Sequence, residues 1–251
     1  MHVPDGFLDA PTSVATGVIA VGGLALALRG ARRELDDRTA PMAGLVATFV
    51  FAGQMMNFPV AGGTSGHLLG GAMAAVLAGP WTAVLCLSTV LLVQGLFMAD
   101  GGITALGTNI TLMGIVGVGV GWLVFKGVRA VLPDRLGSVA PAAAIGALVS
   151  VPVAATVFTL LFAIGGTAPV STEKVLVAMV SWHTVIGVGE AIITFLVVAS
   201  VVGVRPDLVY GARSALRART LEVRQQTPAA PAVSPSPASP SAPTTATGGP
   251  A

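Results

Sequence analysis

The sequence is poor in charge and almost free of cysteine. Asp, Glu, Lys and Arg make up 10% of the 251 residues, whereas soluble domains carry roughly 25%. This composition excludes an ordinary soluble globular protein. The one cysteine, Cys86, lies in an apolar run, where we expect a small buried core residue. A single thiol can form neither an internal disulfide nor a metal site built from several cysteines of this chain.

Several motifs of catalytic chemistry are also missing from the sequence. It contains no GxxxxGK(S/T) phosphate-binding loop, so this chain does not hydrolyse ATP by that route, and it contains neither HExxH nor CxxC. Histidine is scarce as well, with three in the whole chain. The informative polar residues are therefore these histidines and the few acids and amides within apolar segments.

Apolar runs long enough for helical membrane spans, about 20 residues each, recur along the sequence. Hydrophobic residues make up 54% of the chain, and the mean hydropathy is +0.86. Seven apolar segments lie near residues 13–29, 40–57, 66–79, 81–99, 104–125, 139–164 and 174–203. The third is short and rich in glycine, which fits a short or tilted helix or one half of a broken helix. We predict an all-α, polytopic integral membrane protein with seven transmembrane helices.

The basic residues predict the side on which each loop lies. Twelve of the 13 Lys and Arg residues fall into three clusters. The clusters are Arg29, Arg32, Arg33 and Arg38; Lys126, Arg129 and Arg135; and Arg205, Arg213, Arg217, Arg219 and Arg224. Basic loops stay in the cytoplasm, so seven crossings put the N-terminus outside and the C-terminus in the cytoplasm. Five crossings would also satisfy this rule if residues 58–98 formed one re-entrant unit.

Composition divides the chain into three parts. Residues 1–204 form the predicted membrane domain, whose loops at 57–66, 99–102 and 165–173 share the outer side with the N-terminus. Residues 205–226 are polar and basic, and we expect a short cytoplasmic helix on the membrane surface. Residues 227–251 contain seven prolines and no charge. Because such a segment cannot bury enough apolar surface to fold, we expect a disordered tail.

The chain opens with MHVPDGFLDA, which reads as a chelating terminus. A cleaved signal peptide is the alternative, but the segment has no basic residues and carries two aspartates. The amine of Met1, the backbone nitrogen of His2 and the Nδ1 atom of His2 can close two chelate rings on one ion. Flat, nitrogen-rich sites suit Ni(II) and Cu(II), and Co(II) can adopt them too. Pro4, Asp5 and Gly6 form a predicted turn that folds this terminus back into the protein.

His67 is the predicted fourth nitrogen ligand. It lies in GGTSGHLLGG, at the outer end of the third apolar segment and on the same predicted side as His2. Imidazole is the commonest protein metal ligand and is largely neutral at neutral pH. The alternative is a structural or interfacial histidine at the end of a span.

A few polar residues within or near spans are candidates for supporting the site. His183 and Glu190 are seven residues apart and share nearly one helix face, either as a supporting network or as helix-to-helix hydrogen bonds. Asn57 and Gln94 are either packing amides or groups that support the ligands. We expect Asp100 to cap or solvate an outer loop. The glycosylation sequon at 109–111 falls inside a span, so we dismiss it.

Four stretches of the sequence resemble one known family. They are MHVPDGFLDAPTSV at 1–14, AGQMMNFPVAGGTSGHLLGGAMAAVLAGPW at 52–81, FMADGGITALGTNI at 97–110 and HTVIGVGEAIIT at 183–194. The chain resembles the CbiM/NikM family over residues 1 to about 204. These proteins are the substrate-binding membrane subunits, or S components, of cobalt and nickel energy-coupling factor (ECF) transporters.

The resemblance implies a seven-helix subunit of the bacterial or archaeal inner membrane whose N-terminus enters an outer cavity. There the metal is held by Met1, His2 and His67. Implied partners are a second transmembrane subunit (the T component), two ATP-binding subunits and, in many systems, a small accessory membrane subunit. Membrane lipid is a further expected partner, and nucleic acid is not expected to bind.

The expected function is that of a transporter subunit without catalytic residues, with Co(II) or Ni(II) as transported ligand rather than cofactor. The alternatives are a self-sufficient channel or secondary carrier and a membrane metalloenzyme, which needs an open coordination position and a nearby general base. The sequence does not choose between cobalt and nickel, because four nitrogens suit both.

Overall fold

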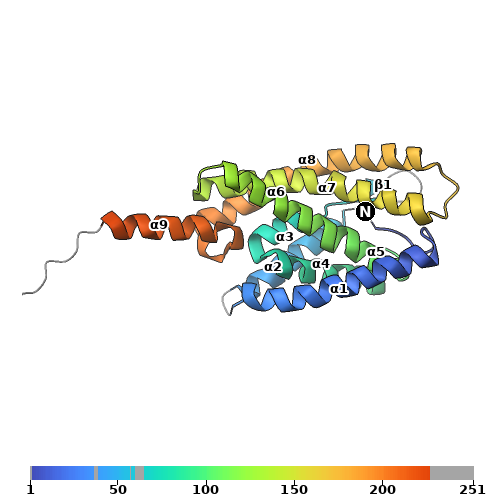
Figure 1. The fold of residues 1–251 in the computed structure, drawn as a ribbon, viewed down its shortest axis with the longest axis horizontal. Coiled ribbons are helices and arrows are strands. Elements are labelled where there is room, and N and C mark those ends of the chain that lie inside the picture. Colours follow the sequence, from blue (N-terminus) through green and yellow to red (C-terminus); the bar gives the residue numbers. More distant parts are fainter. Residues whose placement is uncertain (1, 37–38, 57, 60–64, 227–251) are drawn as a thin grey trace, which may run out of the picture.

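The computed structural model describes residues 2–36, 39–56, 58–59 and 65–226 (Figure 1). The described chain is almost entirely helical. Its α-helices are α1 (Ala10–Glu34), α2 (Ala40–Gln54), α3 (Gly71–Ala78), α4 (Pro80–Phe97), α5 (Leu106–Asn109), α6 (Val118–Val131), α7 (Val139–Gly165), α8 (Thr172–Val204) and α9 (Arg213–Gln226). A π-helix, η2 (Ile110–Gly117), joins α5 to α6, and short 3-10 turns are η3 (Leu136–Ser138), η4 (Pro206–Leu208) and η5 (Tyr210–Ala212). The exception to the predicted all-α class is a small antiparallel pair of strands, β1 (Phe58–Pro59) and β2 (Ser65–Gly66).

Each of the seven predicted apolar segments contains a helix, but the helices differ in length. Five are long and apolar enough to cross a membrane: α1, α4, the continuous helix at 106–131, the helix at 136–165 and α8. α2, with 15 residues, is shorter. α3 has eight residues and begins at Gly71, because the start of the third apolar segment forms β2 and a stretch without regular secondary structure that ends at Gly70, with a φ of +77°. The count of seven crossings stays a prediction.

Local sequence signals mark where the helices begin. Asp9 caps α1 by accepting a hydrogen bond from the Thr12 backbone N–H at 2.9 Å, and a proline opens the first turn. Between α3 and α4, Gly79 has a φ of +103° and is followed by Pro80, which together break the helix. Glu34 reaches from the end of α1 to accept hydrogen bonds from the first backbone N–H groups of α4.

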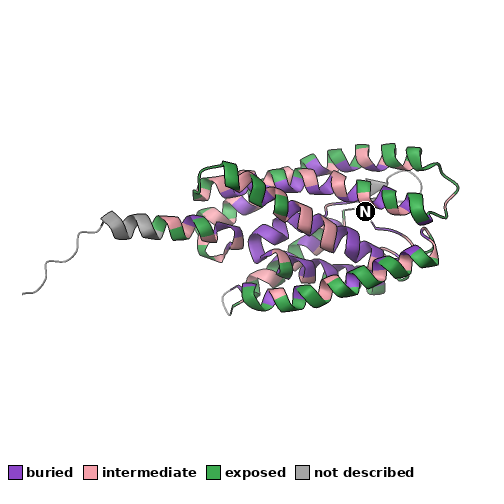
Figure 2. Ribbon diagram, viewed as in Figure 1, coloured by how far each residue is buried: buried purple, intermediate pink, exposed green. Residues whose placement is uncertain are grey.

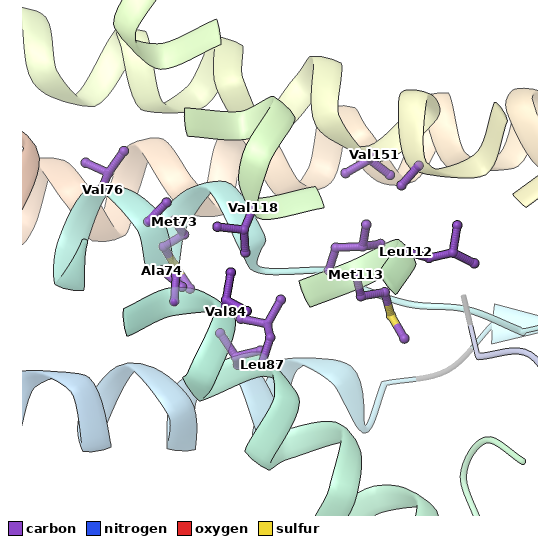
Figure 3. Packing of buried hydrophobic residues seen from close by; sticks show 14 of the residues in the cluster. Met73, Ala74, Val76, Val84, Leu87, Leu112, Met113, Val118 and Val151 are labelled. Carbon is purple, nitrogen blue, oxygen red and sulfur yellow. The ribbon is translucent and has the colours of Figure 1, made fainter. Parts of the chain in front are cut away.

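The core is built around α3. All eight residues of this helix are buried, and it packs against α2, α4, α6 and α7. Figure 3 shows Met73 and Val76 of α3 facing apolar side chains of neighbouring helices. The outer faces of α1 and α8 are exposed instead (Figure 2), and they carry large apolar side chains such as Val18 and Val185. An exposed apolar belt of this kind matches the predicted membrane class.

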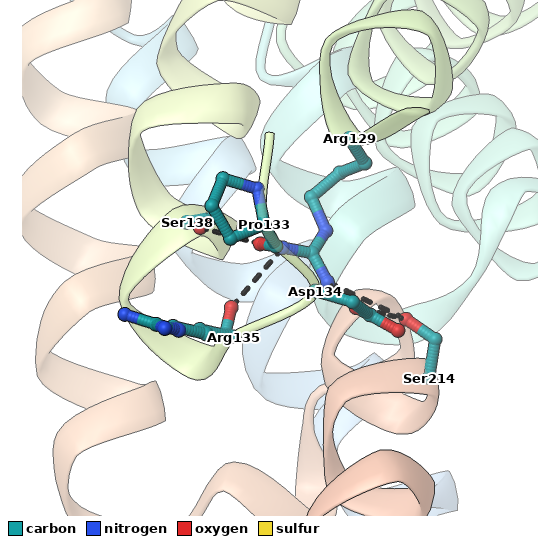
Figure 4. A network of polar contacts seen from close by, with 6 residues as sticks. All are labelled: Arg129, Pro133, Asp134, Arg135, Ser138 and Ser214. Carbon is teal, nitrogen blue, oxygen red and sulfur yellow. Dashed lines mark hydrogen bonds and ion pairs between the residues drawn. The ribbon is translucent and has the colours of Figure 1, made fainter. Parts of the chain in front are cut away.

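The basic segments meet at one end of the bundle. Arg213 donates to the Glu34 carbonyl at 3.1 Å, so the end of α1 lies beside the start of α9. In Figure 4, Arg129 pairs with Asp134, which also accepts a 3.0 Å hydrogen bond from Ser214. The residues that precede α1 lie at the opposite end.

The predicted segment 205–226 begins inside this fold. Val209 and Ala212 are fully buried, whereas α9 then extends away from the bundle (Figure 1). Residues 227–251, the predicted tail, lie outside the described part of the chain.

Candidate functional site

The residues before α1 run back into the helix bundle. His2 and Val3 are buried, with 5% and 1% of their surface exposed. The predicted turn is present, with Gly6 at a φ of +73° and a hydrogen bond from the Phe7 N–H to the Pro4 carbonyl. The ring of Phe7 then stacks against the aromatic rings of α7. This segment is therefore part of the packed protein.

Loops at the same end of the bundle hold the N-terminal segment through its backbone. The Asn109 side chain accepts from the Val3 N–H at 2.8 Å and donates to the Val3 carbonyl at 3.2 Å. The same carbonyl accepts from the Gly102 N–H at 2.9 Å. Further along, the carboxylate of Asp5 accepts two hydrogen bonds from Thr104. These contacts fix the segment between α5 and the loop that precedes it.

After this segment folds back, the rings of His2 and His67 stack on each other. Their centroids are 4.3 Å apart with an interplanar angle of 27°. Around His2, Nδ1 lies 3.0 Å from a carboxylate oxygen of Asp100, and Nε2 lies 3.2 Å from the amide oxygen of Gln94. A neutral imidazole has one N–H, so it can donate to one of these oxygens and offers a lone pair at its other nitrogen.

His67 is fully buried, and only one of its ring nitrogens is engaged. Nδ1 lies 2.7 Å from the backbone carbonyl of Leu68, which accepts a hydrogen bond when Nδ1 carries the proton. In that tautomer the lone pair is on Nε2, which has no hydrogen-bond partner among the described residues. A hydrogen bond at one ring nitrogen that leaves the other bare is the usual state of a metal-binding histidine.

Burial disfavours the charged form of both imidazoles. Burial lowers the pKa of His2 below its ordinary value of 6.5, and the nearby Asp100 offsets part of that effect. Burial lowers the pKa of His67 well below the same value, and the neighbouring His2 adds to the shift. Neutral imidazoles offer lone pairs, so the pair has the protonation state that a cation requires.

The stretch that carries His67 is held in place from two helices. The two carboxylate oxygens of Glu190, on α8, accept from the backbone N–H groups of Leu69 at 2.7 Å and Gly70 at 2.9 Å. The Gln54 side chain, at the end of α2, donates to the Leu69 carbonyl at 2.9 Å. Because Gly70 is the N-cap of α3, the carboxylate also lies where the helix dipole favours negative charge.

His183 and Glu190 share the buried face of α8, as their spacing predicts. Nδ1 of His183 lies 2.7 Å from the carbonyl of Met179 one turn earlier, and its Nε2 has no hydrogen-bond partner among the described residues. His183 contacts neither His2 nor His67 through a hydrogen bond, although its proximity contributes to the pKa shift of His67. Glu190 thus hydrogen-bonds to the ligand-bearing stretch, whereas the hydrogen bond of His183 is to the Met179 carbonyl of its own helix.

Two of the predicted site residues, Met1 and Asn57, lie outside the described residues. Within the described ranges, no group of three or more His, Cys, Asp or Glu side chains could hold a metal ion. Asp100, expected to cap or solvate a loop, lies beside His2 instead. Cys86 is buried, as predicted.

Sequence reasoning missed Gln54 and Asn109. Asn109 was considered only as part of a glycosylation sequon, yet its side chain is 2% exposed and bonds to Val3. Gln54 ends α2 and is fully buried. The available signal was that each amide lies in an apolar segment. Exposing an amide to lipid costs free energy, so polar side chains within spans usually face protein partners.

Fold and site together define a multi-pass helical membrane protein with an enclosed pair of neutral imidazoles. The chain belongs to the CbiM family, whose model, "Cobalt uptake substrate-specific transmembrane region", matches residues 2–208.

Similar curated proteins come from archaea and bacteria. A putative metal transport protein of Haloquadratum walsbyi is 37% identical over 215 residues, which cover 84% of this chain and 94% of that protein. A putative fused nickel transport protein NikMN of Archaeoglobus fulgidus is 36% identical, over 83% of this chain and 68% of that protein. The cobalt transport protein CbiM of Geobacter sulfurreducens is 33% identical, over 83% of this chain and 61% of that protein.

Solved structures share the fold. The crystal structure of a truncated transition metal transporter superposes with a TM-score of 0.76 at 29% identity, covering 81% of this chain and 99% of that one. A second transition metal transporter gives the same TM-score at 27% identity, covering 90% of this chain and all of that one.

Proposed function

We propose that this chain is the S component of an ATP-driven ECF importer for Co(II) or Ni(II). It captures the metal on the outer side of the membrane and releases it inward with partner subunits. The observation that carries the proposal is the stacking of His2 on His67, which the folded-back N-terminal segment makes possible. The names of the relatives, which include cobalt and nickel transport proteins, support the choice of cargo.

The proposed ligands are four nitrogens. Met1 supplies its amine, His2 its backbone nitrogen and Nδ1, and His67 its bare Nε2. Neutral imidazoles and an amine suit Co(II) and Ni(II) alike. This set requires Met1 to be present, unblocked and uncleaved, because an added residue moves the amine out of the chelate ring.

Three further residues support the ligands in this proposal. Glu190 holds the stretch that carries His67, because its carboxylate accepts hydrogen bonds from the backbone N–H groups of Leu69 and Gly70. His183 lies on the same buried face of α8 as Glu190, and Asn57 precedes the strand pair that leads to His67. Outer-shell residues of this kind orient ligands and tune affinity.

The proposed topology has seven crossings, with the N-terminus outside and the C-terminus in the cytoplasm. It is supported by the separation of the two ends of the bundle. Basic segments gather at one end, where Arg213 meets the end of α1, and basic loops favour the cytoplasm. The loop at 99–102 and the start of α1 lie at the other end, which is the outer side in this proposal.

The proposed partners supply what this sequence lacks. A T component, two ATP-binding subunits and a small accessory membrane subunit would complete the transporter, and the ATP-binding subunits would provide the phosphate loop. Relatives described as fused NikMN proteins join two named components in one chain, which supports an accessory component for this one. Release of the metal requires that the loaded and empty forms interact differently with these partners.

Metal analysis of the purified protein with a free N-terminus tests the ligand set. We expect about one Co(II) or Ni(II) per chain, and loss of the metal in His2→Ala, in His67→Ala and in a form extended by one residue before Met1. Unchanged metal content in the extended form would show that the amine is not a ligand. Titration with each metal in competition determines the preferred cargo.

Transport assays separate this function from its alternatives. We expect no uptake by the chain alone in liposomes and ATP-dependent uptake when the T component and ATP-binding subunits are added. Uptake without partners would instead establish a channel or secondary carrier.

A further inference from the structure

We propose that Asn109 is a positioning residue that sets the register of the N-terminus, and with it the place of the metal ligands. The inference rests on the proposed metal-binding function and adds a residue to that site. Its basis is the pair of hydrogen bonds between the Asn109 amide and the backbone of Val3.

These two hydrogen bonds, called the Asn109 clamp here, involve only the backbone of Val3. They therefore fix residue 3 by its place in the chain and not by its side chain. Oδ1 of Asn109 accepts from the Val3 N–H at 2.8 Å while its Nδ2 donates to the Val3 carbonyl at 3.2 Å. Both groups are buried, so neither can exchange its partner for bulk water without opening the site. Because residue 3 is held at both backbone groups, His2 directly before it has a fixed reach toward His67.

The loop before α5 closes around the same segment. Gly101 has a φ of +92°, and a Cβ there would lie 3.1 Å from Asn109 Nδ2 and 3.3 Å from the His2 ring. A Cβ on Gly102 would lie 2.3 Å from the Asp5 backbone nitrogen. The lack of side chains at these positions therefore lets the loop, the clamp and the terminal segment approach within van der Waals contact.

The helix that carries Asn109 is itself anchored. Thr108 hydrogen-bonds through its hydroxyl to the Thr16 hydroxyl at 2.7 Å, and Thr111 donates to the Thr16 carbonyl at 2.9 Å. The π-helix η2 begins directly after Asn109, and such widened turns occur frequently at functional sites. Residues before and after Asn109 are thus hydrogen-bonded to Thr16 of α1, which fixes the backbone from which the Asn109 side chain extends.

Ni(II) titration of the purified full chain, followed by visible absorption, tests this role. We expect Asn109→Ala to lose on the order of 10–100-fold in affinity, the usual effect of removing a group that orients ligands. We also expect its Ni(II) absorption band to differ from that of the wild type, because the amine and His2 no longer share one plane with His67. A change in overall stability would not alter the band.

Two further variants make the test decisive. Asn109→Asp keeps an acceptor for the Val3 N–H but cannot donate to its carbonyl when ionised, so we expect an intermediate loss of affinity. Ser150→Ala removes a buried side-chain hydrogen bond within α7 that involves neither Val3 nor the helix that carries Asn109, and we expect the wild-type affinity and absorption band.

The possible failures are distinguishable. If the wild type binds neither metal, the proposed function is wrong. If the wild type binds and His2→Ala does not, but both Asn109 variants keep the wild-type affinity and band, the clamp is wrong. Should Asn109→Ala fail to fold, Asn109→Asp alone decides by the same readouts.

Discussion

The two ends of the bundle use polar groups in different ways. At the N-terminal end, buried side chains such as Asn109 and Glu190 bind backbone groups of distant segments. At the basic end, the Arg205 and Asp207 pair joins residues two apart in sequence, and their side chains are 57% and 50% exposed. Unsatisfied buried groups cost about 1–3 kcal/mol each, whereas exposed ion pairs contribute roughly 0–1 kcal/mol. Glu34 makes buried contacts of the first kind at the basic end too, so what distinguishes the N-terminal end is the buried ring nitrogen of His67 without a hydrogen-bond partner among the described residues.

The largest expected effect comes from protons, which compete for the ligands at the N-terminal end only. With the proposed ligands, binding releases the His2 amide proton at any pH, and below about pH 7.7, the ordinary pKa of an α-amine, it also displaces a proton from the Met1 amine. Because burial lowers the pKa values of His2 and His67, we expect imidazole protons to compete less than the amine proton in this range. We therefore expect the logarithm of the metal affinity to fall as the pH is lowered. Its slope against pH should be about one above pH 8 and about two from pH 7.5 to 6.5, one for each proton released on binding.

Isothermal titration across this pH range measures that slope. A slope that steepens first near pH 6.5, rather than near 7.7, would indicate that imidazole protons compete instead of the amine. The same titrations on a form with a blocked amine provide the control.

Removal of the Glu190 carboxylate is expected to have the next largest effect. Glu190→Ala leaves two backbone N–H groups at the start of α3 without acceptors, at a cost of roughly 2–6 kcal/mol. The loosened His67 stretch should also lose on the order of 10–100-fold in metal affinity. Thermal unfolding in detergent and metal titration measure both quantities.

Glu173 provides a matched control for this experiment. It lies in the exposed first turn of the same helix, so Glu173→Ala should leave stability and affinity unchanged. Equal losses in the two variants would mean that charge on α8, rather than contact with the His67 stretch, is responsible.

A smaller effect is expected at Gly101. Gly101→Ala places a side chain at a φ of +92° and within 3.3 Å of the His2 ring, so we expect a loss of about 1–2 kcal/mol in stability and a several-fold loss of metal affinity. Gly137→Ala, at a position with open space around its Cα, is the control. Unaltered affinity in Gly101→Ala would show that the loop does not confine His2.

The smallest effect is expected at the basic end. Arg205→Gln removes an exposed ion pair with Asp207, so stability should change by less than about 1 kcal/mol and metal affinity should stay the same. Thermal unfolding and metal titration test both expectations. A loss of affinity here would mean that the two ends of the bundle are coupled, which would erase the contrast between them.

Some features of the site follow from local sequence and others do not. The turn after Pro4 and the shared face of His183 and Glu190 depend on neighbouring residues, and both were predicted. The clamp of Asn109 on Val3 joins residues 106 positions apart, and no local pattern relates them. The same holds for Gln54, whose partner is a backbone carbonyl that carries no sequence signal.

The sequence by itself determined the membrane class, the positions of the apolar segments and the family. Those properties depend on composition and on motifs that are continuous in the chain. Only the tertiary structure decided which apolar segment is central, because hydropathy has the same sign for a helix that faces lipid and one that faces protein. α1 and α3 both read as apolar, yet α3 is buried throughout and α1 exposes its outer face. It also decided which polar groups meet, since burial leaves each of them only the partners that packing supplies.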